Sequence, residues 1–116
     1  MASCSNTWRL AQDDILDFCV NAAYVHTMTW SDDYWPKTAG PPTEQAWIDS
    51  IASFTRAREE MKRLAREVEV LTARVPTGKG HPTYLRAIPL VADDTAYHVG
   101  QLIAVRRALG VRPSPA

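Results

Sequence analysis

The sequence predicts an all-α protein built from three main helices. Two observations lead to this fold class. Apolar residues recur at helical spacing in three long segments, and no segment alternates apolar with polar residues over the length of a strand. Stretches that contain proline and glycine separate the three segments. The chain has 116 residues, of which 46% are hydrophobic, so we expect one helical domain over residues 1–116 with flexible ends at 1–6 and 111–116.

The first helix is predicted over Trp8–Ala22. Ser5 or Asn6 is suited to cap its start, because either side chain accepts a hydrogen bond from a free backbone N–H group. Three aspartates, at positions 13, 14 and 17, fall mostly on the face away from the core. The core face carries Trp8, Ala11, Ile15, Phe18, Cys19 and Ala22.

A long irregular connection follows over Tyr24–Pro42. It contains three prolines and a glycine, and prolines remove backbone donors and bar helix continuation. A structureless loop of this length is unusual inside a compact domain. Its aromatic residues indicate that it packs onto the helices rather than extending into solvent: Trp30, Tyr34 and Trp35.

The second helix is predicted over Pro42–Leu71, with Thr43 as its N-cap and Glu44 at the positive end of the helix dipole. Its charged section, TRAREEMKRLARE, is expected to be a solvated face, since the apolar stripe continues through it. That stripe consists of Trp47, Ile51, Phe54, Met61, Leu64 and Val68.

The third helix is predicted to begin near Pro82 or Thr83 and to end near Leu109. Pro89 lies well inside it, so we expect a kink or a restart there. Gly110 is suited to stop the helix. The core-facing stripe includes two polar residues and runs through Val91, Asp94, His98, Leu102, Val105 and Leu109.

Asp94 and His98 are the candidate functional residues. They lie four residues apart and therefore share one helix face, where they can contact each other or bind one ion. A neutral imidazole and a carboxylate are suitable ligands for Zn²⁺ or Ni²⁺. A pair that merely satisfies its own polar groups in the core is the alternative that spacing favours, because an unpaired buried polar group costs about 1–3 kcal/mol.

Composition excludes several classes of protein. Thirteen basic and thirteen acidic residues cancel, which argues against a general nucleic-acid or anionic-membrane binder. No apolar run approaches the roughly 18 residues that a membrane-spanning helix needs, and the start does not resemble a signal peptide. The two cysteines, Cys4 and Cys19, are interpreted as free thiols, so we expect a cytoplasmic protein.

Two segments resemble the DinB-like (DinB/YfiT) helical bundles. LVADDTAYHVGQLIAVRRALG is similar to the last helix of that superfamily, and WRLAQDDILDFCVNAAYV with WSDDYWPKTAGPPTEQAW is similar to its second helix and the following loop. The resemblance covers about Trp8 to Gly110. It implies a four-helix-bundle fold and a divalent metal ion held by three histidines, one on the second helix and two on the last.

Transferred to this sequence, the resemblance gives an incomplete metal site. His98 matches one ligand, Asp94 stands where the second histidine is usual, and Thr7 stands near the third. His26 and His81 lie in connections and would serve only if these fold over the bundle. We therefore expect Zn²⁺ or Ni²⁺ to bind weakly or not at all, and to be unnecessary for folding.

The resemblance also implies a further helix ahead of the second-helix match, where only MASCSN stands. Without that helix an apolar groove would stay open, and leaving ~400 Å² uncovered would forgo about 10 kcal/mol. We therefore expect a homodimer. Two functions stay open: a degenerate bundle acting as an oligomerising or small-ligand-binding module, and a metal-dependent enzyme of the thiol transferase or isomerase type.

Overall fold

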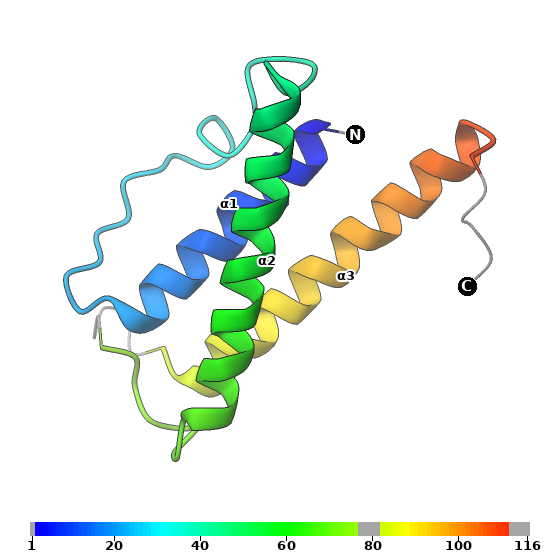
Figure 1. The fold of residues 1–116 in the computed structure, drawn as a ribbon. Helices are drawn as coiled ribbons and strands as arrows, with labels where there is room; N and C mark the ends of the chain where they lie inside the picture. The colour runs from blue at the N-terminus through cyan, green and yellow to red at the C-terminus, as the bar shows by residue number, and fades with distance from the viewer. Residues whose placement is uncertain (1, 77–81, 112–116) are drawn as a thin grey trace.

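The computed structural model describes residues 2–76 and 82–111, which form three helices (Figure 1). These are α1 (Ala2–Val20), α2 (Glu44–Glu67) and α3 (Tyr84–Ala108). Within these ranges the only sheet-like feature is an isolated antiparallel bridge between Arg74 and Thr83. The prediction of an all-α fold with three main helices is confirmed. No helix among the described residues is long and apolar enough to cross a membrane.

Helix α1 begins at Ala2, earlier than the predicted Trp8, and ends at Val20. Asn6 is therefore inside the helix and is not its cap. Its side-chain oxygen accepts a hydrogen bond from Arg9 Nη2 at 3.1 Å. The helix stops where the side chain of Asn21 accepts a hydrogen bond from the backbone N–H of Ala23 at 2.9 Å, which turns the chain.

Helix α2 begins as predicted and ends earlier than the predicted Leu71. The Thr43 hydroxyl accepts a hydrogen bond from the backbone N–H of Ala46 at 3.0 Å, which confirms the N-cap. The helix ends at Glu67 because Val68 adopts an extended backbone conformation. The charged section is a solvated face, as predicted, and Arg63 bridges the exposed Glu60 and Glu67 there at 2.7 and 2.8 Å.

Helix α3 is continuous through Pro89, so of the two predicted alternatives, a kink or a restart, the restart is wrong. Pro89 is the sixth residue of the helix and its side chain is exposed, so its missing N–H removes one hydrogen bond without ending the helix. The predicted stop is confirmed. Gly110 has a φ of 72°, and its N–H donates to Arg107 while that of Val111 donates to Arg106.

Helix α1 is the central element, because both α2 and α3 pack against it while the contact between α2 and α3 is slight. Trp8 joins all three helices. Its ring meets Phe54 of α2 edge-on at 4.4 Å, and its Nε1–H donates to Thr95 Oγ1 of α3 at 3.2 Å. Gln12 adds a hydrogen bond to the carbonyl oxygen of Phe54 at 2.9 Å. The buried core is small and consists of Cys19, Met61, Val75, Ala87 and Val91.

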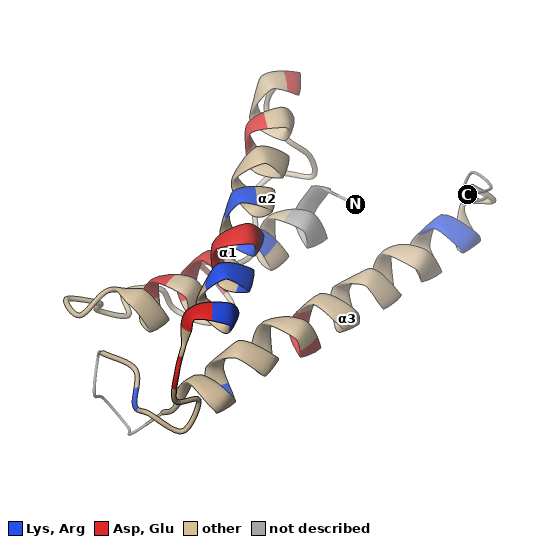
Figure 2. Ribbon diagram, turned by 60° about the horizontal axis from the view of Figure 1, so that its bottom comes forward, with Lys and Arg blue, Asp and Glu red and all other residues tan. Residues whose placement is uncertain are grey.

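One side of the three-helix array is open. The apolar stripes of α2 and α3 are buried near the core but exposed at the other end, where Ile51 is 47% and Val105 is 42% exposed. In both views the C-terminal part of α3 extends away from α1 and α2 (Figures 1 and 2). Figure 2 also shows a long stretch of α3 without Lys, Arg, Asp or Glu, which the sequence identifies as residues 95–105. The array therefore ends in an apolar, partly unpartnered helix.

Candidate functional site

A cleft of about 670 Å³ surrounds the two candidate residues on α3. Its walls come from α3, from α1 and from the connection between α1 and α2. Aromatic and aliphatic side chains make up much of the lining, with a few polar groups among them. The lining residues are Thr7, Trp30, Ser31, Tyr34, Trp35, Asp94, Tyr97, His98, Gln101, Leu102, Ala104 and Val105.

His98 is buried, at 7% exposure, with Asp94 beside it, which confirms the prediction from the helical spacing. His98 Nε2 lies 3.6 Å from Asp94 Oδ1, a distance of ion-pair contact rather than a hydrogen bond. The imidazole also stacks on Trp8 with 6.0 Å between ring centres and an angle of 13° between planes. The ring is therefore fixed from two sides, by α1 and by its own helix.

Burial raises the pKa of the Asp94 carboxyl above its ordinary value of 3.8, and the charge of His98 lowers it in part. The folded protein therefore holds this proton more tightly than the unfolded chain. The resulting stabilisation is complete below pH 3.8 and is lost as the pH rises through the folded-state pKa.

We expect Asp94→Asn to stabilise the protein at pH 7, because the amide removes the cost of ionising a half-buried carboxyl. The gain is at most about 1 kcal/mol, since Asp94 keeps part of its contact with water. It should shrink as the pH falls toward 4. Urea unfolding at a fixed protein concentration at pH 4 and pH 7 measures the difference. Asp93→Asn, at the exposed neighbouring position, is the matched control, and an Asp94→Asn variant that is less stable at pH 7 would contradict the expectation.

Thr7 lies on the same cleft, at the position where the resemblance implies a third ligand. The residue is buried, and its hydroxyl donates a hydrogen bond to the backbone carbonyl of Tyr34 at 2.8 Å. A hydroxyl engaged in this way is a poor substitute for an imidazole ligand. Thr7 therefore joins α1 to the connection.

The donor set around His98 falls short of a complete metal centre. A catalytic zinc ion takes three ligands from the protein, whereas Asp94 and His98 supply two. In the part of the chain that the structure describes, no three His, Cys, Asp or Glu residues are grouped to hold an ion. His26 does not line the cleft and lies beside Asp14 instead, at 3.6 Å. His81 falls outside the described residues.

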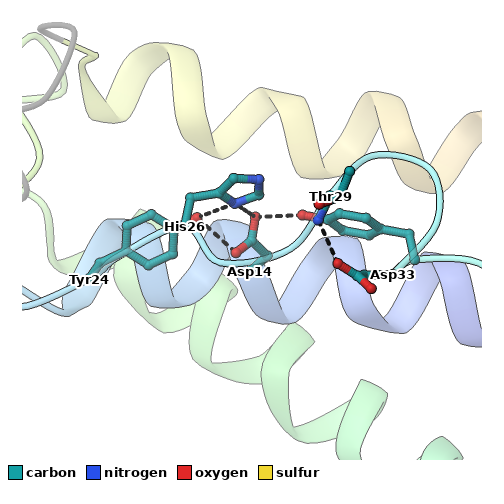
Figure 3. A network of polar contacts seen from close by, with 6 residues as sticks. Asp14, Tyr24, His26, Thr29 and Asp33 are labelled. Atoms are coloured by element: carbon teal, nitrogen blue, oxygen red, sulfur yellow. Dashed lines mark hydrogen bonds and ion pairs between the residues drawn. The ribbon is translucent and has the colours of Figure 1, made fainter.

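Asp14 holds the connection against α1 (Figure 3). Its two carboxylate oxygens accept hydrogen bonds from the hydroxyl groups of Tyr24 at 2.8 Å and Tyr34 at 3.0 Å. His26 Nδ1 completes the group at 3.0 Å from the Tyr24 hydroxyl. Burial, together with the hydrogen bond and charge of Asp14, raises the pKa of Tyr34 to about 12 and also raises that of Tyr24. Both hydroxyls therefore stay protonated donors across the physiological range.

This network forms the outer wall of the cleft. Tyr34 is fixed at both its hydroxyl and its carbonyl, by Asp14 and Thr7. Trp35 follows Tyr34 in the chain, Trp30 precedes it by four residues, and both tryptophan rings are exposed. The ring centres of Trp30 and Tyr34 lie 5.2 Å apart. The sequence prediction placed Asp14 on the outer face and so missed its role. The available signal was the pair of tyrosines in the connection, because a packed tyrosine needs a partner for its hydroxyl.

Comparison of this chain with models of protein families, with curated proteins and with solved structures finds no match.

Proposed function

We propose that this protein is a homodimeric binding module that takes a small, largely apolar molecule into the cleft at Asp94 and His98. The observation that carries this proposal is the cleft itself. Its volume of about 670 Å³ falls within the range of about 300–1,000 Å³ that is typical of small-molecule sites. Such sites combine an apolar lining with a few polar groups that orient the ligand.

The lining defines the chemistry of the ligand. Trp35 and Tyr97 offer flat apolar surfaces, at 55% and 63% exposure, to a planar ligand body. Asp94 and Gln101 offer oxygen acceptors on the α3 side of the cleft. A neutral aromatic molecule with one hydroxyl group satisfies both features, whereas an anion would face the Asp94 carboxylate.

We expect 2-naphthylmethanol, a neutral aromatic alcohol, to shift the backbone amide signals of Tyr97, Gln101 and Ala104 in an NMR titration. Trp35→Ala should weaken its binding by about tenfold, since an aromatic contact contributes on the order of 1 kcal/mol beyond buried area. Trp47→Ala is the matched control, because Trp47 is also a partly exposed tryptophan but does not line this cleft. Shifts elsewhere in the chain, or equal affinity in Trp35→Ala, would refute the proposal.

A metal-dependent enzyme of the thiol transferase or isomerase type is the second candidate. Its support is that Thr7, Asp94 and His98 share one cleft, as the resemblance to DinB-like bundles implies. The described donor set offers two ligands, Asp94 and His98, whereas a catalytic zinc ion takes three from the protein. Metal content after purification without chelators separates the candidates: near-stoichiometric Zn²⁺ or Ni²⁺ favours the enzyme.

The homodimer in this proposal rests on surface area. The chain exposes 8040 Å², whereas a compact monomer of 12.9 kDa exposes about 6,300 Å². The radius of gyration, 15.8 Å, likewise exceeds the roughly 13 Å of a compact domain of this length. Covering the excess of about 1,700 Å² on each of two copies would bury an area typical of obligate homodimers.

The second copy covers the open side between α2 and α3. Thr95, Val99 and Ile103 follow one another at intervals of four and so share a face of α3. Trp8 bridges Thr95 and Phe54, so this face and the Ile51 end of α2 border the same side of the array. A twofold axis brings this apolar surface against itself, as closed dimers require.

A further inference from the structure

A second cleft, of about 600 Å³, lies on another side of α1. Arg9 lines this cleft and Thr7 lines the first one. Two residues apart on a helix, they point to nearly opposite sides. The remaining walls come from the connection and from α2, including Trp47 and Arg56. The proposed function at Asp94 makes no use of this cleft.

Arg9 is held in place at the α1 wall. Its Nη1 donates to Asp13 at 3.0 Å and its Nη2 to Asn6 at 3.1 Å. Its Nε is buried and has no hydrogen-bond partner in the described part of the chain. Asp13 therefore offsets the charge of the Arg9 guanidinium, while the Arg9 Nε–H group stays unsatisfied.

Arg56 faces the same cleft from α2. Its guanidinium makes no hydrogen bond or ion pair with any residue that the structure describes. Arg9 and Arg56 line the same cleft, and the charge of Arg56 helps to lower the pKa of Asp13 against the larger effect of burial. The cleft therefore contains one cation that no carboxylate neutralises by contact, close to a second cation that is already fixed.

The neighbours of Arg56 suit an anion, since the Asp13 carboxylate, on which the charge of Arg56 acts, is already paired with Arg9 at 3.0 Å. Ser53, one turn earlier on α2, lines the cleft with a hydroxyl donor. The one acid in the lining, Asp49, is seven residues from Arg56, about 10 Å along the helix axis, and accepts a hydrogen bond from Gln45 at 2.8 Å. Repulsion from Asp49 is therefore weak at the Arg56 end of the cleft.

Flat apolar groups make up another part of the lining, beside polar side chains such as Thr38 and Ser50. Trp47 is 37% exposed at the cleft, and the connection adds three proline rings, at positions 36, 41 and 42. A guanidinium pairs with a carboxylate through two parallel hydrogen bonds, and an indole stacks on a planar body. From this juxtaposition we propose that the second cleft is a binding site for a small aromatic carboxylate, with Arg56 on the carboxylate and Trp47 on the ring.

Benzoate, phenyl phosphate and uncharged benzamide are the probes that test this site by NMR titration. Benzoate is expected to shift the Trp47 indole and Ser53 amide signals, while benzamide of the same shape binds at least about tenfold more weakly. Equal binding of benzamide would overturn the anion site. Tighter binding of phenyl phosphate than of benzoate would overturn the assignment of a carboxylate.

Arg56→Gln is expected to lower benzoate affinity about tenfold, and Arg56→Lys to restore part of it, because lysine keeps the charge without the paired donors. Arg58→Gln is the matched control, since Arg58 lies on the same helix, is exposed and does not line the cleft. Arg56 is exposed, so its variants keep the fold, and unchanged amide spectra check this. Wild-type benzoate affinity in Arg56→Gln would refute the proposal. Binding of 2-naphthylmethanol at Tyr97 is measured separately, so failure at one cleft is distinguishable from failure at the other.

Discussion

Light scattering on this protein at low micromolar concentration is expected to give twice the 12.9 kDa mass of one chain. The reason is the apolar surface that three helices leave uncovered, of which Val99 at 38% and Ile103 at 44% exposure are part. Contiguous apolar patches of several hundred Å² are unusual on monomers. At about 25 cal/mol per Å², their burial contributes an amount comparable to the whole stability of a small domain.

Ile51→Asp and Ile103→Asp are expected to dissociate this dimer and to lower the midpoint of thermal unfolding strongly, because each puts a charge into the apolar contact. The midpoint of the unmodified protein should rise with concentration, as it does when folding and association are coupled. Val25→Asp is the control, since Val25 is 63% exposed in the connection, away from this surface. A stable folded species of 12.9 kDa whose unfolding midpoint is independent of concentration would exclude the dimer.

The parts of the fold that depend on local chemistry could be predicted from the sequence. Thr43 caps α2 and Gly110 ends α3 because each acts on backbone groups within a few residues. The contact between α1 and the connection could not be predicted in this way. Thr7 is tied to the carbonyl of Tyr34, 27 residues along the chain, and no local pattern carries that contact.

In the candidate site, too, local features could be predicted from the sequence and long-range contacts could not. The pairing of Asp94 with His98 follows from their separation of four residues on one helix. The contribution of the connection to the site could not be predicted, because an irregular segment has no periodicity that indicates its path. Asp14 shows the consequence: helical spacing assigns it to the outer face, yet that face is where the connection lies.

The exposed ends of the stripes follow from this limit too. Four residues of the predicted core faces stay at least 37% exposed: Trp47, Ile51, Val105 and Leu109. Helical periodicity identifies which face of a helix seeks a partner, and it does not say whether the same chain supplies one. In this protein the unpartnered ends of α2 and α3 are the basis for proposing a second copy.

Asp14→Ala is expected to destabilise the protein by about 2–4 kcal/mol and to weaken binding of 2-naphthylmethanol about tenfold. The carboxylate accepts hydrogen bonds from Tyr24 and Tyr34, and Tyr34 is buried at 5% exposure, so its hydroxyl would lose its acceptor without gaining full access to water. Hydrogen bonds to a charged group contribute about 1.5–3 kcal/mol each. Tyr34, in the wall of the cleft, would then be held by Thr7 but no longer by Asp14. A ligand would have to order this part of the wall when it binds.

Urea unfolding and an NMR titration measure the two effects of Asp14→Ala. Asp17→Ala is the matched control, because Asp17 lies on the same helix, is exposed and accepts only a 3.4 Å contact from Asn21. Tyr34→Phe removes only one of the two hydrogen bonds to Asp14 and is expected to cost about 1.5–3 kcal/mol, which keeps the test available if Asp14→Ala fails to fold. The effect on binding distinguishes a positioning role from a merely structural one: if Asp14→Ala or Tyr34→Phe loses stability while 2-naphthylmethanol binds as in the unmodified protein, Asp14 stabilises the connection without shaping the site.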